Sequence, residues 1–297
     1  LLCKQDVSGS SPLNSINKNK KMAADKGKQF EYAVMLAAYG RINEELTGEV
    51  KSTFDTIMRN TNNGSSIEDD VMKAARETMD RLEPSSNKLA FYKSFRQLGG
   101  GAGGGGEPKT DILYKIGGTK YRVSMKWGDK YQLSSAGISK TVKVLTDVLK
   151  GAAKEGGMNT NNLGEIALIL EQIDNQLGSL PKKGEQPYMK AKLAKANHLN
   201  LQLQEILGSR KNPKAAEAFS FFKDAVVKES LTGEYLFGKQ ADATAEYVLN
   251  EKTLRKIDDK LIREVSDKTY VRLRLKGRGK TKEGVRLNEL VVTIEPK

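Results

Sequence analysis

The stretch Gly99–Ser135 reads GGGAGGGGEPKTDILYKIGGTKYRVSMKWGDKYQLSS, and the rest of the chain is organised around it. Two apolar runs, 111–115 and 121–126, flank a Gly-Gly pair at 117–118, which is a strong signal for a tight hairpin turn. Seven glycines in the eight positions 99–106 give the backbone too much freedom for a rigid element. We therefore predict two antiparallel strands that follow a mobile hinge.

The predicted hairpin gathers complementary side chains at one end. Asp111 opens the first strand and Lys126 ends the second, so a carboxylate and an ammonium group come close together. Ser124 shares a face with Lys126, because side chains alternate along a strand. Phosphodiester hydrolysis by water uses a hard cation held by carboxylate oxygens, and a nearby lysine stabilises the developing charge. The hairpin thus predicts half of a metal-dependent nuclease site.

Helical patterns surround this hairpin. From Ala23 onward, apolar residues at helical spacing predict a core-facing helix, with a stripe formed by Phe30, Val34, Ala37 and Ala38. Glu31 lies beside that stripe. The segment 89–95 suits either a strand or a helix. Further helices are predicted over 65–82, 139–153, 165–177, 189–207 and 213–231, with one or two more over 241–263.

The chain closes with a predicted basic hairpin. In its first strand Val271, Leu273 and Leu275 alternate with cationic residues, so one face is apolar and the other is charged. A nucleic-acid backbone could lie against the charged face. The alternative is that the charges only protect an edge strand from aggregation. The cationic residues of this strand and its turn are Arg272, Arg274, Lys276, Arg278, Lys280, Lys282 and Arg286.

Composition narrows the function classes. Fifty Lys and Arg against 37 Asp and Glu give a net charge of +13, which favours a polyanionic partner through counterion release; alternatively, the lysines only keep the surface soluble. Cys3 and His198 are the only residues of their kinds, which excludes an intrachain disulfide and a Cys/His zinc site. We expect neither a membrane span nor a signal peptide, because no run approaches ~20 apolar residues and no charged-then-apolar segment opens the chain.

These patterns divide the chain into four parts. Residues 1–22 have the polar, lysine-rich composition of a flexible basic arm. Residues 23–155 form a core that carries the hairpin and its hinge at 99–106. Residues 156–265 are predicted to be helical, and 266–297 form the basic hairpin that joins the core. The predicted fold class is α/β, of the α+β kind: a mixed sheet flanked by helices, with a helical insertion.

Pro108, Asp111, Ser124 and Lys126 resemble the motif of the PD-(D/E)xK nuclease superfamily, in which an Asp opens one strand and an acidic-x-Lys follows on the next. The resemblance covers about 26–150 and implies a restriction-endonuclease-like core, Mg²⁺ or Mn²⁺ as cofactor, and DNA, or alternatively RNA, as partner. The rest of the chain resembles, more distantly, uncharacterised proteins of tailed bacteriophages that carry an SxK-type core. Two departures stand out: a serine replaces the second acid, and the proline lies three residues before the Asp.

The resemblance implies a role for each matching residue. Asp111 would be the principal metal ligand, and Lys126 would position the water or stabilise charge. Ser124 would line the site. Gln132 resembles a glutamine that follows the lysine in one branch of nucleases.

The serine at position 124 is a weak neutral ligand, so a metal would need another carboxylate. Glu31 matches a Glu that members often carry on the preceding core helix, and it would be a second ligand or bind the metal's water. Glu107, just before the hairpin, is the other candidate ligand.

The first hypothesis is therefore a Mg²⁺-dependent deoxyribonuclease of a bacteriophage, found in the host cytoplasm or the virion, with an oligomer or virion proteins as further partners. The rival is a non-catalytic nucleic-acid-binding or virion structural protein with a degenerate nuclease fold. A third hypothesis is an interaction protein whose charge is only solubilising. Trp127 and Tyr131 either stack on a base or pack against the hairpin.

Overall fold

A computed structural model describes residues 26–39, 52, 55, 67–82, 90–94, 108–116, 119–128, 130–156, 160–178, 183–184, 186–208, 213–239, 241–276, 280–281, 284–287 and 289–297. The predicted arm at 1–22, the hinge at 99–106 and the Gly-Gly turn lie outside the described residues. So do three of the predicted site residues, Glu107, Arg278 and Lys282.

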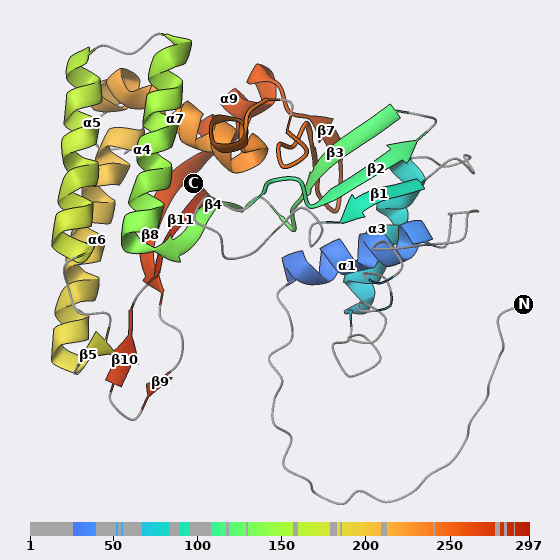
Figure 1. The fold of residues 1–297 in the computed structure, drawn as a ribbon, viewed down its shortest axis with the longest axis horizontal. Coiled ribbons are helices and arrows are strands. Elements are labelled where there is room, and N and C mark those ends of the chain that lie inside the picture. The colour runs from blue at the N-terminus through green and yellow to red at the C-terminus, as the bar shows by residue number, and fades with distance from the viewer. Residues whose placement is uncertain are drawn as a thin grey trace, which may run out of the picture.

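The described segments form two lobes, each with its own hydrophobic core (Figure 1). Among the described residues, the first lobe contains α1, α3 and a five-stranded sheet, and Phe30, Val71 and Val123 lie in its core. The second lobe contains the longer helices and a three-stranded sheet, and Leu145 and Phe222 lie in its core. The α+β fold class with a C-terminal hairpin is confirmed.

The sheet of the first lobe contains the predicted hairpin. Its β2–β3 pair is antiparallel, as predicted, whereas β3 pairs with β6 in parallel. Within the segment 89–95, where the sequence suits either a strand or a helix, Ala90–Ser94 form an edge strand. In spatial order the strands are β1 (Ala90–Ser94), β2 (Ile112–Ile116), β3 (Thr119–Met125), β6 (Tyr247–Leu249) and β7 (Leu254–Lys256).

Two helices cover one face of this sheet. The predicted core-facing helix is α1 (Lys26–Tyr39), and its stripe residues Phe30 and Val34 are fully buried. It packs against α3 (Asp69–Leu82), which begins with two aspartates that suit the positive end of the helix dipole. The core between helices and sheet uses every second strand residue, including Val123 and Met125, so the alternate side chains lie on the opposite face.

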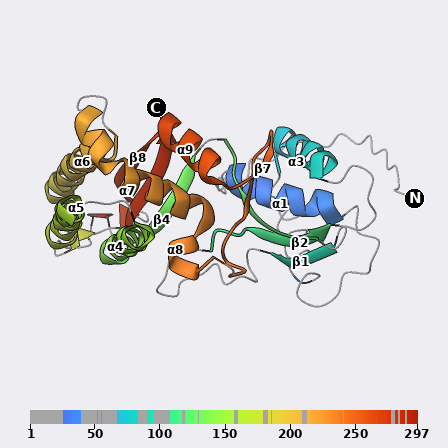
Figure 2. The same ribbon diagram turned by 90° about the horizontal axis from the view of Figure 1, so that it is seen from above.

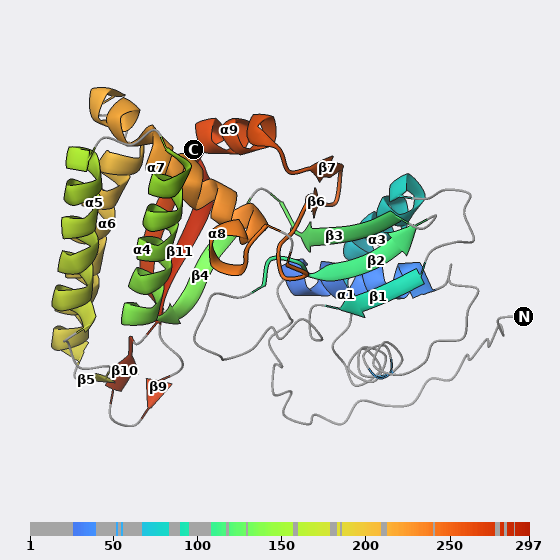
Figure 3. The same cartoon turned by 45° about the horizontal axis from the view of Figure 1, so that its top comes forward.

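The helices of the second lobe follow the predicted pattern closely. The first of these helices is α4 (Ile138–Glu155). Its apolar face is buried against the other helices and the sheet, as the sequence indicates. In Figures 1 and 3 the longer helices stand side by side and cover this lobe's sheet. The helices are α4 (Ile138–Glu155), α5 (Thr160–Ile173) with a π turn over Asp174–Gly178, α6 (Gln186–Gly208), α7 (Pro213–Thr232), α8 (Glu234–Phe237) and α9 (Asp259–Lys268).

The basic hairpin lies in the sheet of the second lobe. β8 (Thr269–Lys276) and β11 (Glu289–Pro296) pair in antiparallel fashion, and β4 (Tyr131–Gly137) adds on the far side of β11. The predicted alternation is confirmed: β8 buries its apolar residues and exposes Arg272, Arg274 and Lys276. A smaller sheet lies beside it and contains β5 (Lys183–Gly184), β10 (Gly284–Arg286) and β9 (Lys280–Thr281).

Two strand assignments differ from the sequence prediction. The prediction of helix over 241–263 is wrong before Asp259, because β6 and β7 form there and complete the first sheet. β4 was not predicted, since YQLSSAG shows no clean alternation of apolar and polar residues. β6 and β4 exist because a distant partner, β3 or β11, pairs with each of them, and β7 then pairs with β6.

Backbone hydrogen bonds tie the stretch before β2 to the segment between α8 and β6. The N–H groups of Lys109 and Thr110 both donate to the carbonyl of Ala243, at 2.9 and 3.2 Å. Figure 2 shows the sheet of the first lobe beside α7, α8 and α9 of the second. Within the described segments, no helix is long and apolar enough to cross a membrane.

Candidate functional site

Strand register brings Asp111 next to Ser124. Ile112 is paired with Val123, and the N–H of Asp111 extends the ladder by donating to the Val123 carbonyl at 2.9 Å. One step beyond that pair, Asp111 lies across from Ser124, on the face that α1 and α3 leave uncovered. The sequence prediction that the hairpin positions this carboxylate is confirmed.

One oxygen of the Asp111 carboxylate is held by three donors. Its Oδ2 accepts from the Met125 N–H at 2.6 Å, from Ser124 Oγ at 3.3 Å and from Lys126 Nζ at 3.4 Å. The other oxygen, Oδ1, accepts no hydrogen bond from a described residue. The side chains of Asp111 and Lys126 are 16% and 19% exposed, so solvent or a ligand reaches both. The structure thus joins Asp111, Ser124 and Lys126 in one half-buried group.

Glu31 comes from the other side of the sheet. It is half-buried on α1, between the buried Phe30 and Tyr32, and α1 packs on the Val123 face of the hairpin. Among the described residues, no group of three or more Asp, Glu, His or Cys side chains is placed to hold a metal ion. A cation at Asp111 would therefore rest mainly on that carboxylate and on water.

Gln132 lies apart from the hairpin, on β4 of the second lobe. It is exposed and sits in one cross-strand row with Thr293 of β11 and Arg272 of β8. In the next row on this face, Arg274 of β8 is paired with Val291 of β11. Gln132 therefore belongs to the basic outer face of the second sheet, which the sequence alone could not indicate.

Lys109 is a residue that the sequence prediction missed. Its side chain is buried, and Nζ donates to the carbonyls of Gln132 at 3.0 Å and Leu133 at 2.9 Å. Leu133 is skipped in the pairing of β4 with β11, so this bulge removes carbonyls from the ladder and Lys109 satisfies them. The contact ties the stretch just before Asp111 to the second lobe.

The two aromatic residues after the hairpin pack differently: Trp127 is partly buried against the first core, and Tyr131 is buried in the second. Trp127 meets the ring of Phe30 edge-on at 5.6 Å, with Lys26 Nζ 5.5 Å from the Trp127 ring centre. Tyr131 is only 7% exposed in the core of the second lobe. Trp127 thus packs against α1, whereas Tyr131 packs in the second core and also lines a pocket.

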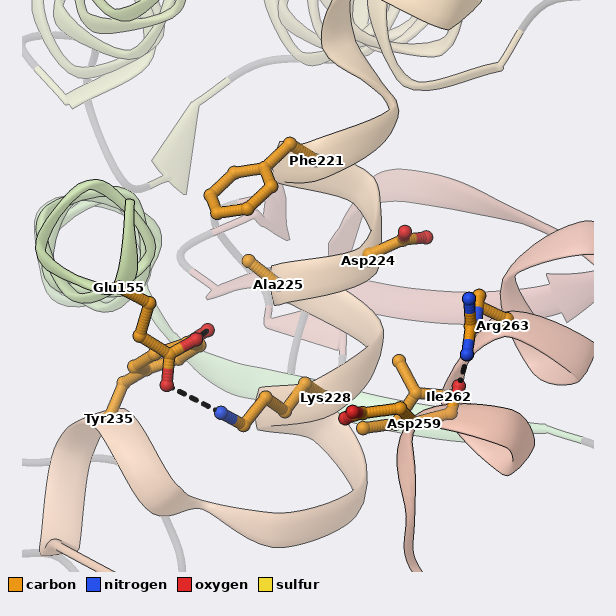
Figure 4. Close-up of a pocket in the computed structure, with 9 residues that line it drawn as sticks. All are labelled: Glu155, Phe221, Asp224, Ala225, Lys228, Tyr235, Asp259, Ile262 and Arg263. Carbon is orange, nitrogen blue, oxygen red and sulfur yellow. Dashed lines mark hydrogen bonds and ion pairs between the residues drawn. The ribbon is translucent and has the colours of Figure 1, made fainter. Parts of the chain in front are cut away.

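Two pockets of about 280 Å³ each lie outside this group. One lies between the lobes, and its lining includes Tyr131, Val248 and Asn250. The other, in the second lobe, contains an ion pair between Lys228 and Glu155 (Figure 4).

Comparison of the chain with protein-family models, with curated proteins and with solved structures gives no match.

Proposed function

We propose that this protein is a metal-dependent nuclease that hydrolyses DNA phosphodiester bonds by attack of water. The observation that carries the proposal is the half-buried group in which Asp111 Oδ2 is held by Ser124, the Met125 N–H and Lys126, while Oδ1 faces no protein donor among the described residues. A carboxylate with one oxygen fixed and the other open suits a hard cation. The association with a bacteriophage is part of the same proposal and rests on the resemblance alone.

The donor set fits a weakly held Mg²⁺ or Mn²⁺. Mg²⁺ commonly takes one or two carboxylates and keeps several waters, so Asp111 would hold the ion together with water, and Glu31 does not join it because it lies on the other side of the sheet. When bound, the ion would polarise the phosphate and lower the pKa of its water. The hydroxyl of Ser124 and the Met125 N–H orient the Asp111 carboxylate toward that ion.

Lys126 provides the positive charge of the protein itself. Its Nζ lies 3.4 Å from Asp111 Oδ2, which keeps the ammonium at the position where a phosphate would approach the carboxylate. There it stabilises the negative charge that develops on the phosphate oxygens, or it orients the attacking water.

The basic face of the second sheet supports nucleic acid as the substrate. Arg272, Arg274 and Lys276 are exposed on β8, and Gln132 extends their face across β4. Such a surface contacts phosphates without reading sequence. Lys280 belongs to the neighbouring strand β9.

The test compares two lysines at opposite ends of β3, Lys126 and Lys120. Lys126→Ala removes the ammonium beside Asp111, whereas Lys120→Ala removes a lysine paired with Asp242 at the other end of β3. With Mg²⁺ or Mn²⁺, Lys126→Ala should lower the cleavage rate of linear and circular DNA roughly 100-fold, as loss of one transition-state donor does. Lys120→Ala should cleave like the wild type. No metal-dependent cleavage of DNA or RNA by the wild-type protein would refute the proposal.

A non-catalytic nucleic-acid-binding protein is the second candidate. The burial of Ser124, which takes the place of the family's second acid and donates its hydroxyl to Asp111, favours it. In that case the wild type binds DNA with a steep salt dependence and cleaves nothing. Arg274→Ser would weaken that binding, whereas Asp111→Asn would leave it intact.

A further inference from the structure

The pocket between the lobes begins one strand away from the Asp111 group. Val248, which lines it, is the partner of Ser124 in the parallel pairing of β3 with β6. Partners in neighbouring strands present their side chains on the same face, about 5 Å apart. The pocket therefore lies on the sheet face that carries Asp111, one strand further on.

The pocket lining combines three kinds of surface. Aliphatic side chains form its walls, and they come from both lobes: Val248, Leu261, Val265 and Pro296. Asn250 and Thr253 add polar groups from the β6–β7 turn. Arg255 and Lys268 add positive charge. Apolar walls, a few hydrogen-bonding groups and a cationic edge match a base, its sugar and its phosphate.

We infer that this pocket takes one nucleotide of the nucleic-acid substrate, next to the phosphate that is cleaved. The inference deepens the proposed nuclease function and rests on it for the identity of the substrate. The base lies between the aliphatic walls, and a phosphate lies toward Arg255 and Lys268.

The charged side chains that line the pocket are Arg255, Lys268 and Glu264, and together they have one excess positive charge. Glu264 Oε2 pairs with Arg255 at 2.7 Å, and Oε1 pairs with Lys268 at 3.0 Å, so two cations share one carboxylate. These hydrogen bonds, that of Arg255 first, hold the pKa of Glu264 at about 2, and it stays ionised. A phosphate group supplies the missing negative charge, and Lys268, with 71% of its side chain exposed, can turn toward it at little cost.

Asn250 is fixed in a way that suits recognition of a base. Its Oδ1 accepts hydrogen bonds from the N–H groups of Lys252 and Thr253, at 2.9 and 2.7 Å, and from the Thr253 hydroxyl. The amide oxygen is thus used within the turn. The NH₂ group remains as the donor that Asn250 brings to the pocket, where the acceptor atoms on the edge of a base are suitable partners.

Two tryptophan substitutions in one turn test the inference. Thr253→Trp puts a large ring at an exposed position that lines the pocket, and Lys252→Trp puts the same ring one residue away, outside the lining. Binding of 2′-deoxyadenosine 5′-monophosphate to the full chain is measured by calorimetry. Saturable binding that Thr253→Trp weakens about tenfold or more, and Lys252→Trp does not, is expected. Absence of saturable binding, or equal effects of the two tryptophans, would overturn the inference.

The same experiment separates this inference from the proposed function. The binding is repeated with Lys120→Ala, which removes a lysine paired with Asp242 outside the pocket lining and should leave the affinity for the mononucleotide unchanged. If the wild type binds the nucleotide in the pocket but cleaves no nucleic acid, the nuclease proposal fails and the pocket stands. If it cleaves DNA and Thr253→Trp neither weakens nucleotide binding nor slows cleavage, only the pocket assignment fails. Thermal unfolding checks that each variant is folded.

Discussion

Two carboxylate–lysine pairs, one in each lobe, differ in how completely the protein satisfies them. In the second lobe both oxygens of Glu155 are used, with Lys228 Nζ at 2.6 Å and the Tyr235 hydroxyl at 2.7 Å (Figure 4). In the first lobe Lys126 and its neighbours bind only one oxygen of Asp111. A closed pair braces helices, whereas a pair with an open, accessible oxygen has capacity for a ligand. The proposed chemistry therefore belongs to Asp111.

The largest expected effect is the loss of cleavage when the carboxylate charge of Asp111 is removed. Asp111→Asn keeps the shape of the side chain but removes its charge, so metal-dependent cleavage should fall roughly 10³-fold, within the range that loss of a preorganised charge produces. Glu155→Gln should leave cleavage within about twofold, because that carboxylate is not at the proposed site. Cleavage of a fluorescent DNA substrate measures both. Equal losses for the two variants would mean that Asp111 has no special role.

The next largest effect concerns how tightly the closed pair is packed. A Cβ at Gly151 on α4 would lie 2.4 Å from Cδ1 of the Tyr235 ring, so Gly151→Ala forces the ring or the helix to move. Overpacking of this kind costs about 1–3 kcal/mol of unfolding free energy. Urea denaturation measures it.

The matched control is Gly164→Ala in α5, where a Cβ meets nothing within 4 Å. It should stabilise the protein by about 0.5–1 kcal/mol, because alanine loses less backbone entropy than glycine in a helix. If both alanines stabilise, the Tyr235 ring is not held where the structure places it.

A third carboxylate, that of Glu229, differs from both pairs because one of its oxygens lacks a partner among the described residues while solvent cannot reach it. Glu229 is fully buried; its Oε2 accepts from the Tyr235 N–H, and Oε1 has no partner among the described residues. Burial raises the pKa of Glu229 to about 7. Between its ordinary pKa of 4.5 and about 7, the folded state therefore holds a proton that the unfolded state has released.

The sign of this linkage predicts a loss of stability as the pH rises through that window. Glu229→Gln removes the titrating group. As the pH rises through the window, the unfolding free energy of the variant should therefore fall less than that of the wild type, and the difference between the two decreases should be on the order of 1–3 kcal/mol. Urea denaturation on either side of the window measures the difference. Parallel curves for the two proteins would show that Glu229 does not bind a proton there.

The smallest expected effect is the loss of the closed pair itself. Glu155→Gln breaks the ion pair with Lys228, but the glutamate side chain is 45% exposed, so screening limits the cost to about 0.5–1 kcal/mol at neutral pH. Burial raises the pKa of Glu155, but the hydrogen bonds from Lys228 and Tyr235 and the charge of Lys228 together outweigh it, so the pKa lies below its ordinary value. The pair stabilises above the ordinary carboxylate range, and this contribution disappears as the pH falls through the lowered pKa. The wild type and the variant should therefore converge in acid, as urea denaturation at low pH would show.

Local patterns determined the elements that carry a strong period or a strong turn. The helical spacing of Phe30 and Val34 and the alternation along β8 are periodic patterns that can be read from the chain itself. The Gly-Gly pair is likewise a local signal for a turn. The pairing of Asp111 with Lys126 followed from the same logic, because a two-strand hairpin fixes register over a few residues. Side-chain alternation also placed Ser124 and Lys126 on one face.

Only the tertiary structure decided which distant segments meet. β6 is three residues long and has no readable period, yet it completes the first sheet because β3 offers a free edge. Lys109 looks like a surface lysine until β4 presents two carbonyls at its bulge, and Gln132 joins Arg272 only through β11. The inter-lobe pocket likewise needs both lobes. Such contacts depend on long-range strand pairing, whose energy lies in partners that no local window of the chain contains.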